Sequence, residues 1–250
     1  MNFGGAGVAD LARSLFDTPR WVETRFMLLR NEAVVTGLTA DRRHFVASSS
    51  RRPLVSVVGR PDRAFIAGAV EDARTAEVNV LCAEEHKGHV ADALPLWRQI
   101  GATVHGWPGD VPFPAAPPPA EARLLEPGEV RALDHLPADL RDELVSASAW
   151  SPVAGAFAGG APVAFCCAGA VTETLWDVGI DTLEGYRRRG LARKAARLLI
   201  ATLGAAGKSP VWGSEDGNAP SLALARQMGF VPVERLAVFE RSQRVGALKG

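Results

Sequence analysis

The residues with the clearest chemical potential lie in one stretch, residues 179–192, which reads Gly-Ile-Asp-Thr-Leu-Glu-Gly-Tyr-Arg-Arg-Arg-Gly-Leu-Ala. Leu175–Thr182 predicts a strand, and apolar residues at near-helical spacing predict a helix that starts near Gly190. Small residues at Gly190 and Ala192 let backbone N–H groups approach an anion at the positive end of this helix. Three arginines add positive charge: Arg187, Arg188 and Arg189. The stretch predicts a pyrophosphate site, and the alternative for such a turn alone is a solvated basic surface.

Two common phosphate-binding motifs are absent. No Gly-Lys-Ser/Thr follows the turn, and the chain contains no Gly-x-Gly-x-x-Gly. The sequence therefore excludes the phosphate loop of nucleotide hydrolases and the dinucleotide-binding fingerprint.

A second motif follows about twenty residues downstream. Pro210-Val-Trp212 predicts a short strand, and Asn218-x-x-Ser221 opens a helix that ends at Met228-Gly229-Phe230. Together with Arg187-x-x-Gly190-x-Ala192, this pattern resembles the GNAT superfamily of acyl-CoA N-acyltransferases over residues 122–241. The resemblance implies an α/β (α+β) fold with a mixed, mostly antiparallel sheet flanked by helices.

The resemblance also implies acetyl-CoA as a co-substrate and a set of cofactor-binding residues. The turn would hold the CoA pyrophosphate, and Asn218 would bond the pantetheine amides, its alternative being a plain helix cap. In the family, the thioester lies where two strands splay apart, here those ending at Thr182 and starting at Pro210. The expected cofactor-binding residues are Ile180, Asp181, Thr182, Arg187, Arg188, Arg189, Gly190, Leu191, Ala192, Asn218 and Ser221.

The expected catalytic residues are two carboxylates. The family often places a general-base Glu six residues before the position of Ile180, but this position is Thr174. Glu173 is adjacent and would need a β-bulge to come into line, and Asp177 is the next candidate; each is otherwise a surface carboxylate. The family's general-acid Tyr position is Ala225, so the acid is a water, the substrate or an unplaced residue.

Composition argues against two classes of partner. The chain has 28 basic and 28 acidic residues, so no charge favours nucleic acid or an anionic membrane. Residues 144–172 lack charge, but their glycines and prolines predict two buried strands rather than a membrane span. Three cysteines give no disulfide framework, which together with the absence of a visible signal peptide favours the cytoplasm. Cys166 and Cys167 are expected on opposite faces of one strand.

Six prolines between Trp107 and Pro119 predict a linker between two domains. The expected boundaries are 1–106 for a degenerate GNAT-like domain without catalysis, 107–121 for the linker, 122–241 for the catalytic domain and 242–250 for a tail. The repeat rests on Leu-x-Arg-Gln-x-Gly at residues 96–101 and 224–229, both interpreted as helix ends. Gly59-Arg-Pro-Asp-Arg63 stands where the first half would need its anion turn, and Pro61 lacks an N–H there.

One competing motif lies in the first half, Cys82-x-x-x-His86-x-x-His89. Two histidines and a thiolate are zinc ligands, but no fourth ligand follows at a recognisable spacing, so no metal is expected.

The sequence thus predicts an acetyl-CoA-dependent N-acetyltransferase that acts on a small-molecule amine by direct transfer in a ternary complex. The alternative is a CoA-sensing or partner-binding module whose catalysis has lapsed, and a third possibility is an acyl donor larger than acetyl. The acceptor and the oligomeric state stay open.

Overall fold

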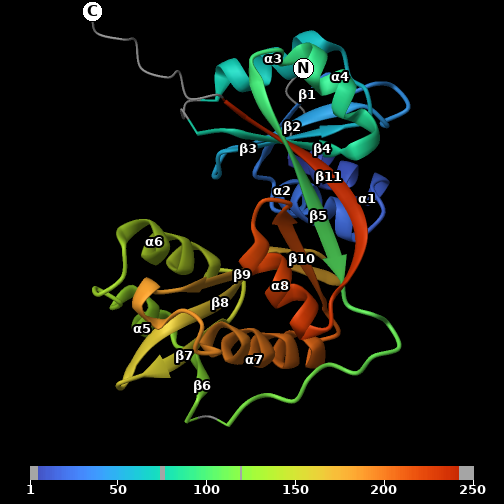
Figure 1. Cartoon of the computed structure of the whole chain (residues 1–250). Coiled ribbons are helices and arrows are strands. Elements are labelled where there is room, and N and C mark those ends of the chain that lie inside the picture. The colour runs from blue at the N-terminus through green and yellow to red at the C-terminus, as the bar shows by residue number, and fades with distance from the viewer. Residues whose placement is uncertain (1–4, 74–76, 119, 242–250) are drawn as a thin grey trace, which may run out of the picture.

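The computed structural model describes residues 5–73, 77–118 and 120–241, which form one eleven-stranded sheet with helices on both faces (Figure 1). The first half contributes α1 (Gly5–Ser14), α2 (Val22–Leu29), β1 (Ala33–Thr36), β2 (Phe45–Ser49), β3 (Leu54–Val58), α3 (Arg63–Asp72), β4 (Asn79–Ala83), α4 (Lys87–Ala93) and β5 (Trp97–Gly106), with 3-10 turns at Pro19–Trp21 and Glu84–His86. The second half contributes β6 (Ala122–Leu125), α5 (Pro127–Arg131), α6 (Ala138–Ala147), β7 (Val153–Ala158), β8 (Ala161–Val171), β9 (Leu175–Thr182), α7 (Leu191–Ala205), β10 (Ser209–Glu215), α8 (Ala219–Met228) and β11 (Val231–Arg241), with a 3-10 turn at Glu184–Tyr186.

The two halves exchange their last strands. The strand order is β1-β2-β3-β4-β11-β5-β10-β9-β8-β7-β6, so β11 pairs with β4 and β5 pairs with β10. The antiparallel β5/β11 pair lies at the centre of the sheet. Outward from it, β4, β3, β2 and β1 on one side correspond to β10, β9, β8 and β7 on the other, and β6 is an additional edge strand. In Figure 1 β5 and β11 cross the centre of the molecule and join its upper and lower parts. The predicted mixed, mostly antiparallel sheet in two tandem halves is confirmed.

Alternating side chains give each half a core on both faces of its sheet. In the first half, α3 and α4 pack on one face, and α1 and α2 pack on the other. In the second half, α7 and α8 cover one face, while α5 and α6 cover the opposite one. Cys166 lies in the core under α7 and Cys167 in the core under α6, so the two thiols occupy opposite faces as predicted. Residues 144–172 end α6 and form β7 and β8, which confirms the two predicted strands.

The predicted helix end at residues 96–101 is wrong. These residues lie at the start of β5, whereas residues 224–229 end α8, so the two Leu-x-Arg-Gln-x-Gly segments are not equivalent. The helix of the first half ends earlier, at Ala93. By position in the strand order, α4 of the first half corresponds to α8 of the second, and β5 corresponds to β11. The segment adopts this strand because β11 pairs with β5 along its whole length, from Trp97 to Gly106.

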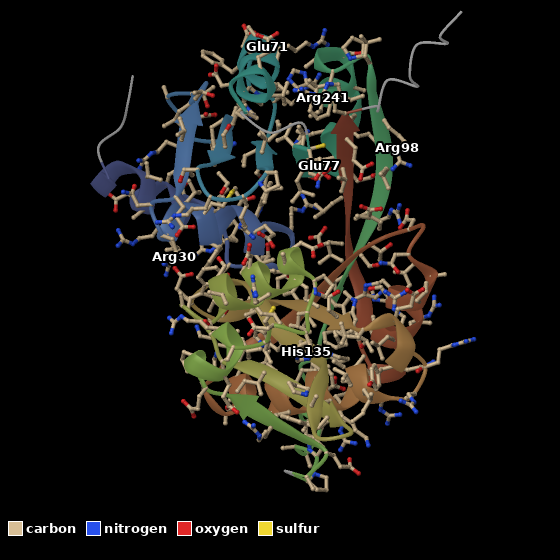
Figure 2. All side chains as sticks on the ribbon, turned by 90° about the vertical axis from the view of Figure 1, so that its left-hand side faces the viewer. Arg30, Glu71, Glu77, Arg98, His135 and Arg241 are labelled. Carbon is tan, nitrogen blue, oxygen red and sulfur yellow. The ribbon has the colours of Figure 1, made fainter. Side chains whose placement is uncertain are left out.

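Polar and aromatic contacts hold the halves together. Arg25 of α2 is buried and forms an ion pair of 2.7 Å with Glu173, while Asp17 accepts hydrogen bonds from the backbone and hydroxyl of Thr174. The Phe26 ring lies 5.3 Å from that of Trp150. Arg30, labelled in Figure 2, lies over both rings.

A fragment of residues 120–250 is expected to be largely insoluble, because β11 would lose both of its neighbours and β10 would lose β5. The check is the soluble yield and thermal unfolding of the fragment beside the full chain. A fragment that unfolds cooperatively and binds acetyl-CoA as tightly as the full chain would contradict this expectation.

Candidate functional site

The turn before α7 has the backbone of an anion site. Gly190 caps the helix in the left-handed region with φ 77°, and Arg188 also has a positive φ, of 61°. Gly190 supplies no side-chain acceptor, so the first N–H groups of α7 are uncapped. Arg187, Arg188 and Arg189 are exposed around them. Residues 187–192 therefore present donors and positive charge together, which suits a pyrophosphate.

The strand that leads to this turn separates from its neighbour. Parallel pairing between β9 and β10 runs only from Leu175 opposite Ser209 to Asp177 opposite Val211. Beyond this point β9 stays paired with β8, and β10 stays paired with β5. The expected gap exists, although the two strands are paired at their starts and diverge afterwards. Among the residues that the structure describes, no strand pairs with this edge of β9 beyond Asp177, so backbone N–H groups on the edge can polarise a carbonyl there.

A cavity of about 220 Å³ lies where the strands diverge. It is lined by residues of both halves: Pro19, Arg20, Val22, Glu23, Leu81, Ala102, Val104, Asp177, Val211, Gly213, Ser214, Glu215, Leu236 and Val238. Most of these side chains are apolar, and the carboxylates are Glu23, Asp177 and Glu215. Such a cavity can hold a small apolar molecule with a cationic end.

Asp177 lies at the last position where β9 pairs with β10. The register shifts between Ala168 and Ala170 leave Gly169 as a bulge beside it, and a Cβ built on Gly169 would lie 3.3 Å from Asp177 Oδ2. Burial and the neighbouring Glu23 carboxyl raise the pKa of Asp177 to about 8, while Arg52 and the Gly213 backbone N–H oppose this shift. A carboxylate with this proton affinity is suited to take a proton from an ammonium group near neutral pH.

Glu173, the other expected catalytic residue, lies outside the cavity. It sits in the turn between β8 and β9, where it pairs with Arg25, and its backbone carbonyl accepts a hydrogen bond from Lys208. The bulge in this hairpin is at Gly169 and brings Asp177, not Glu173, beside the strand gap.

Ile180, Asp181 and Thr182 end β9 between the gap and the turn. Ile180 packs toward the α7 core, whereas Asp181 lies at the surface and its pKa is raised by partial burial of the carboxyl, an effect that Arg187 opposes. Thr182 Oγ1 is buried without a hydrogen-bond partner in the described chain, and the Thr182 carbonyl accepts a hydrogen bond from Arg187. An orphaned hydroxyl at this point is consistent with a ligand that supplies its partner.

The start of α8 carries the remaining expected ligand-binding residues. Asn218 caps the helix, because its side-chain oxygen accepts the Ser221 N–H at 3.2 Å, and the residue itself is exposed. Ser221 Oγ accepts a hydrogen bond of 3.0 Å from the indole of Trp212. Ala225 is fully buried, and Tyr186, the only tyrosine, lies under the Arg189 guanidinium. No tyrosine hydroxyl therefore stands at the Ala225 position.

The corresponding turn of the first half is built differently. The Asp62 side chain accepts the Ala64 N–H and so caps α3, and the Arg60 N–H is bonded to His44 Nδ1 at 2.9 Å. Strands β3 and β4 remain paired as far as Val57 opposite Cys82, so they do not open a gap. Donors that a pyrophosphate needs are engaged within the protein here.

The Cys82, His86 and His89 motif does not converge. Cys82 is buried in β4, and the His89 ring contacts the Pro61 carbonyl oxygen at 2.7 Å. Within residues 5–73, 77–118 and 120–241, no cluster of three or more histidine, cysteine or acidic side chains is arranged to hold a metal. No helix in the same ranges has the length and apolar composition that a membrane span requires.

The residues that sequence reasoning missed come from the first half. Glu23, Arg20 and Arg52 lie near Asp177 although more than a hundred positions separate them from it in the chain. No local motif marks them. The exchange of the last strands places β5 beside β10 and joins the two halves in one sheet, which brings these residues to the cavity.

Comparison with known proteins finds the same fold in solved structures. Residues 155–239 match the family model for GNAT acetyltransferases. Among solved structures, a GNAT-family acetyltransferase described as putative, from Novosphingobium aromaticivorans, is 19% identical with a TM-score of 0.62, over 91% of this chain and 98% of that one. A GCN5-related N-acetyltransferase-like protein from Streptococcus suis is 16% identical with a TM-score of 0.65, over 94% and 97% of the two chains. A tandem GNAT protein of the clavulanic acid biosynthesis pathway is 17% identical with a TM-score of 0.51, over 80% and 79%. No curated protein matches the sequence.

The fold is thus that of a tandem GNAT protein. Over residues 155–239, the C-terminal region is similar to the GNAT acetyltransferase family.

Proposed function

We propose that this chain transfers an acetyl group from acetyl-CoA to the primary amine of a small molecule, in a ternary complex at the gap between β9 and β10. The observation that carries the proposal is that β9 loses its pairing with β10 after Asp177. From there the strand runs from the cavity beside Asp177 to the uncapped turn at Gly190.

The residues of this gap fit the two ends of acetyl-CoA. Backbone N–H groups at Gly190–Ala192 and the arginines before them would hold the pyrophosphate. The unpaired edge of β9 from Val178 to Thr182 would face the pantetheine arm, as would the exposed start of α8 at Asn218. When bound, the co-substrate supplies an acyl group activated as a thioester.

Asp177 provides the chemistry at the acceptor. Its carboxylate takes a proton from the acceptor ammonium, which leaves a neutral amine with a free lone pair in an apolar cavity. N–H groups on the edge of β9 polarise the carbonyl under attack. The departing thiolate is protonated by the acceptor or by water, because Ala225 offers no hydroxyl.

The first half has no acyl-CoA site in this proposal. Asp62 already caps α3, and β3 and β4 stay paired, so both features of the second-half site are missing. Its role is to close the acceptor cavity with residues of the first 3-10 turn, α2 and β4. We place the activity in the cytoplasm, consistent with three free and buried cysteines.

The test is a panel of amines, including alkylamines, amino acids, polyamines and aminoglycosides, assayed with acetyl-CoA by release of the CoA thiol. Because the base acts in its charged form and its pKa is raised to about 8, kcat/KM is expected to fall about tenfold per pH unit below that value. Tight CoA binding with no acylated amine and background thioester hydrolysis would instead establish a CoA-sensing or partner-binding module. Faster transfer from a longer acyl-CoA would identify a larger donor.

A further inference from the structure

Glu23 and Asp177 come from opposite halves of the protein and meet at the Gly169 bulge. A Cβ built on Gly169 would lie 3.3 Å from Asp177 Oδ2 and 3.8 Å from Glu23 Oε1, so both carboxyl groups border the space that this glycine leaves open. Glu23 lies in the first turn of α2, a helix that packs against β8 and β9. The nearby Glu23 carboxyl therefore raises the pKa of the Asp177 carboxyl.

Arg52 completes the arrangement from the turn between β2 and β3. Its Nη1 lies 2.7 Å from Glu23 Oε2 and donates to the Gly169 carbonyl oxygen at 3.3 Å. The guanidinium also lies over the Phe26 ring of α2, which holds it in place. A cation therefore stands beside Glu23 and the Gly169 bulge.

Among the charged groups near Asp177, Glu23 and Arg52 have the largest effect on the pKa of its carboxyl group. Arg20 lines the cavity but is paired with Glu85 and Glu234. Glu215 lines the cavity from β10, and the thiols of Cys166 and Cys167 lie on β8; burial raises the pKa of both thiols far above neutral, so they carry no charge. The remaining lining from β4, β5 and β11 is apolar and adds no further charge beside the two carboxyl groups.

We propose that Glu23 and Arg52 are positioning residues for the base Asp177, with Glu23 strengthening and Arg52 weakening the hold of Asp177 on its proton. The first half thus takes part in catalysis without binding the co-substrate. The inference rests on the proposed function, in which Asp177 receives the acceptor proton. The first half then has a chemical role, because Glu23 and Arg52 adjust the proton affinity of Asp177 to suit an alkylammonium acceptor near neutral pH.

The test is a pH titration of the Asp177 carboxyl group in the full chain by infrared difference spectroscopy, with the Asp177→Asn spectrum subtracted to identify the band. Glu23→Gln is expected to lower the titration midpoint by about one pH unit or more, because a nearby negative charge is lost. Arg52→Gln is expected to raise the midpoint, because a nearby positive charge is lost. The double variant is expected to fall between the two single variants.

Matched controls separate this effect from a loss of structure. Glu240 and Arg98 form another ion pair between β11 and β5, and neither residue lines the cavity; Figure 2 shows Arg98 in the upper part of the molecule. Glu240→Gln and Arg98→Gln are expected to leave the midpoint unchanged. Glu23→Asp and Arg52→Lys keep the charges and are expected to restore most of the wild-type midpoint.

The outcomes separate this inference from the proposed function. Midpoints of Glu23→Gln and Arg52→Gln that move in the same direction, or by no more than the controls, would overturn the inference whether or not an amine is acylated. With an accepted amine, the acid limb of kcat/KM is expected to move as the midpoint does, with an unchanged KM for acetyl-CoA. Opposite midpoint shifts without any acylated amine would support the carboxyl pair and refute the transferase.

Discussion

Replacing Gly190 by Asp is expected to weaken acetyl-CoA binding at least about 100-fold, or about 2.7 kcal/mol. The carboxylate would accept the first N–H groups of α7 and place a negative charge where the pyrophosphate binds. The substitution also adds a Cβ at φ 77°, a conformation that side chains rarely adopt. Calorimetric titration of acetyl-CoA into the folded variant measures the effect.

Two variants isolate the cause of this loss. Gly190→Asn caps the helix and strains the backbone in the same way but carries no charge, so its loss of affinity is expected to be smaller. Gly207→Asp introduces the same residue at φ 76° after the other end of α7, into open space, and is expected to leave acetyl-CoA affinity unchanged. Wild-type affinity in Gly190→Asp would exclude the turn as the pyrophosphate site.

Replacing Asp177 by Asn is expected to lower kcat/KM at least about 100-fold, because removing a general base typically costs two to four orders of magnitude. The dissociation constant of acetyl-CoA is expected to stay within about threefold of the wild type, because Asp177 borders the acceptor cavity rather than the turn. Steady-state kinetics at several pH values, together with calorimetry, separates the two effects.

Glu173 is the comparison for this variant. Glu173→Gln is expected to retain most of the activity and to lower the melting temperature by a few degrees, because buried Arg25 loses an ion-pair partner. A large loss of kcat/KM in Glu173→Gln with an active Asp177→Asn variant would exchange the two roles.

The strands and helices around the candidate site in the second half could be predicted from the sequence. Their boundaries carry local signals, such as the Gly159-Gly160 turn with both φ values positive, the Asn218 cap and the Gly229 stop. The strand predicted over Leu175–Thr182 is β9, with the same bounds. Where the local chemistry and the tertiary structure agree, the pattern of residues suffices.

The start of β5 shows where local signals fail. Leu96-Trp-Arg-Gln-Ile contains several residues of high helix propensity, which favour a helical interpretation. The segment is nevertheless a strand, because β11 arrives from more than a hundred residues away and offers a complete ladder of hydrogen bonds. No property of residues 96–101 by themselves encodes that partner.

The candidate site was predictable only in part for the same reason. Arg187–Ala192 form a continuous motif, so their position at a helix start followed from sequence alone. The choice between Glu173 and Asp177 depended on the location of a bulge, which lies at Gly169 on the neighbouring strand. Glu23 and Arg52 depend on packing between the halves and had no signal in the sequence.

The most direct measurement is a crystal structure of the Asp177→Asn variant with acetyl-CoA and an accepted amine. The proposed mechanism predicts the pyrophosphate on the N–H groups at the start of α7, the thioester between β9 and β10, and the amine in the cavity within hydrogen-bond reach of residue 177. Acetyl-CoA bound at the start of α3, or a thioester that does not face this cavity, would contradict it.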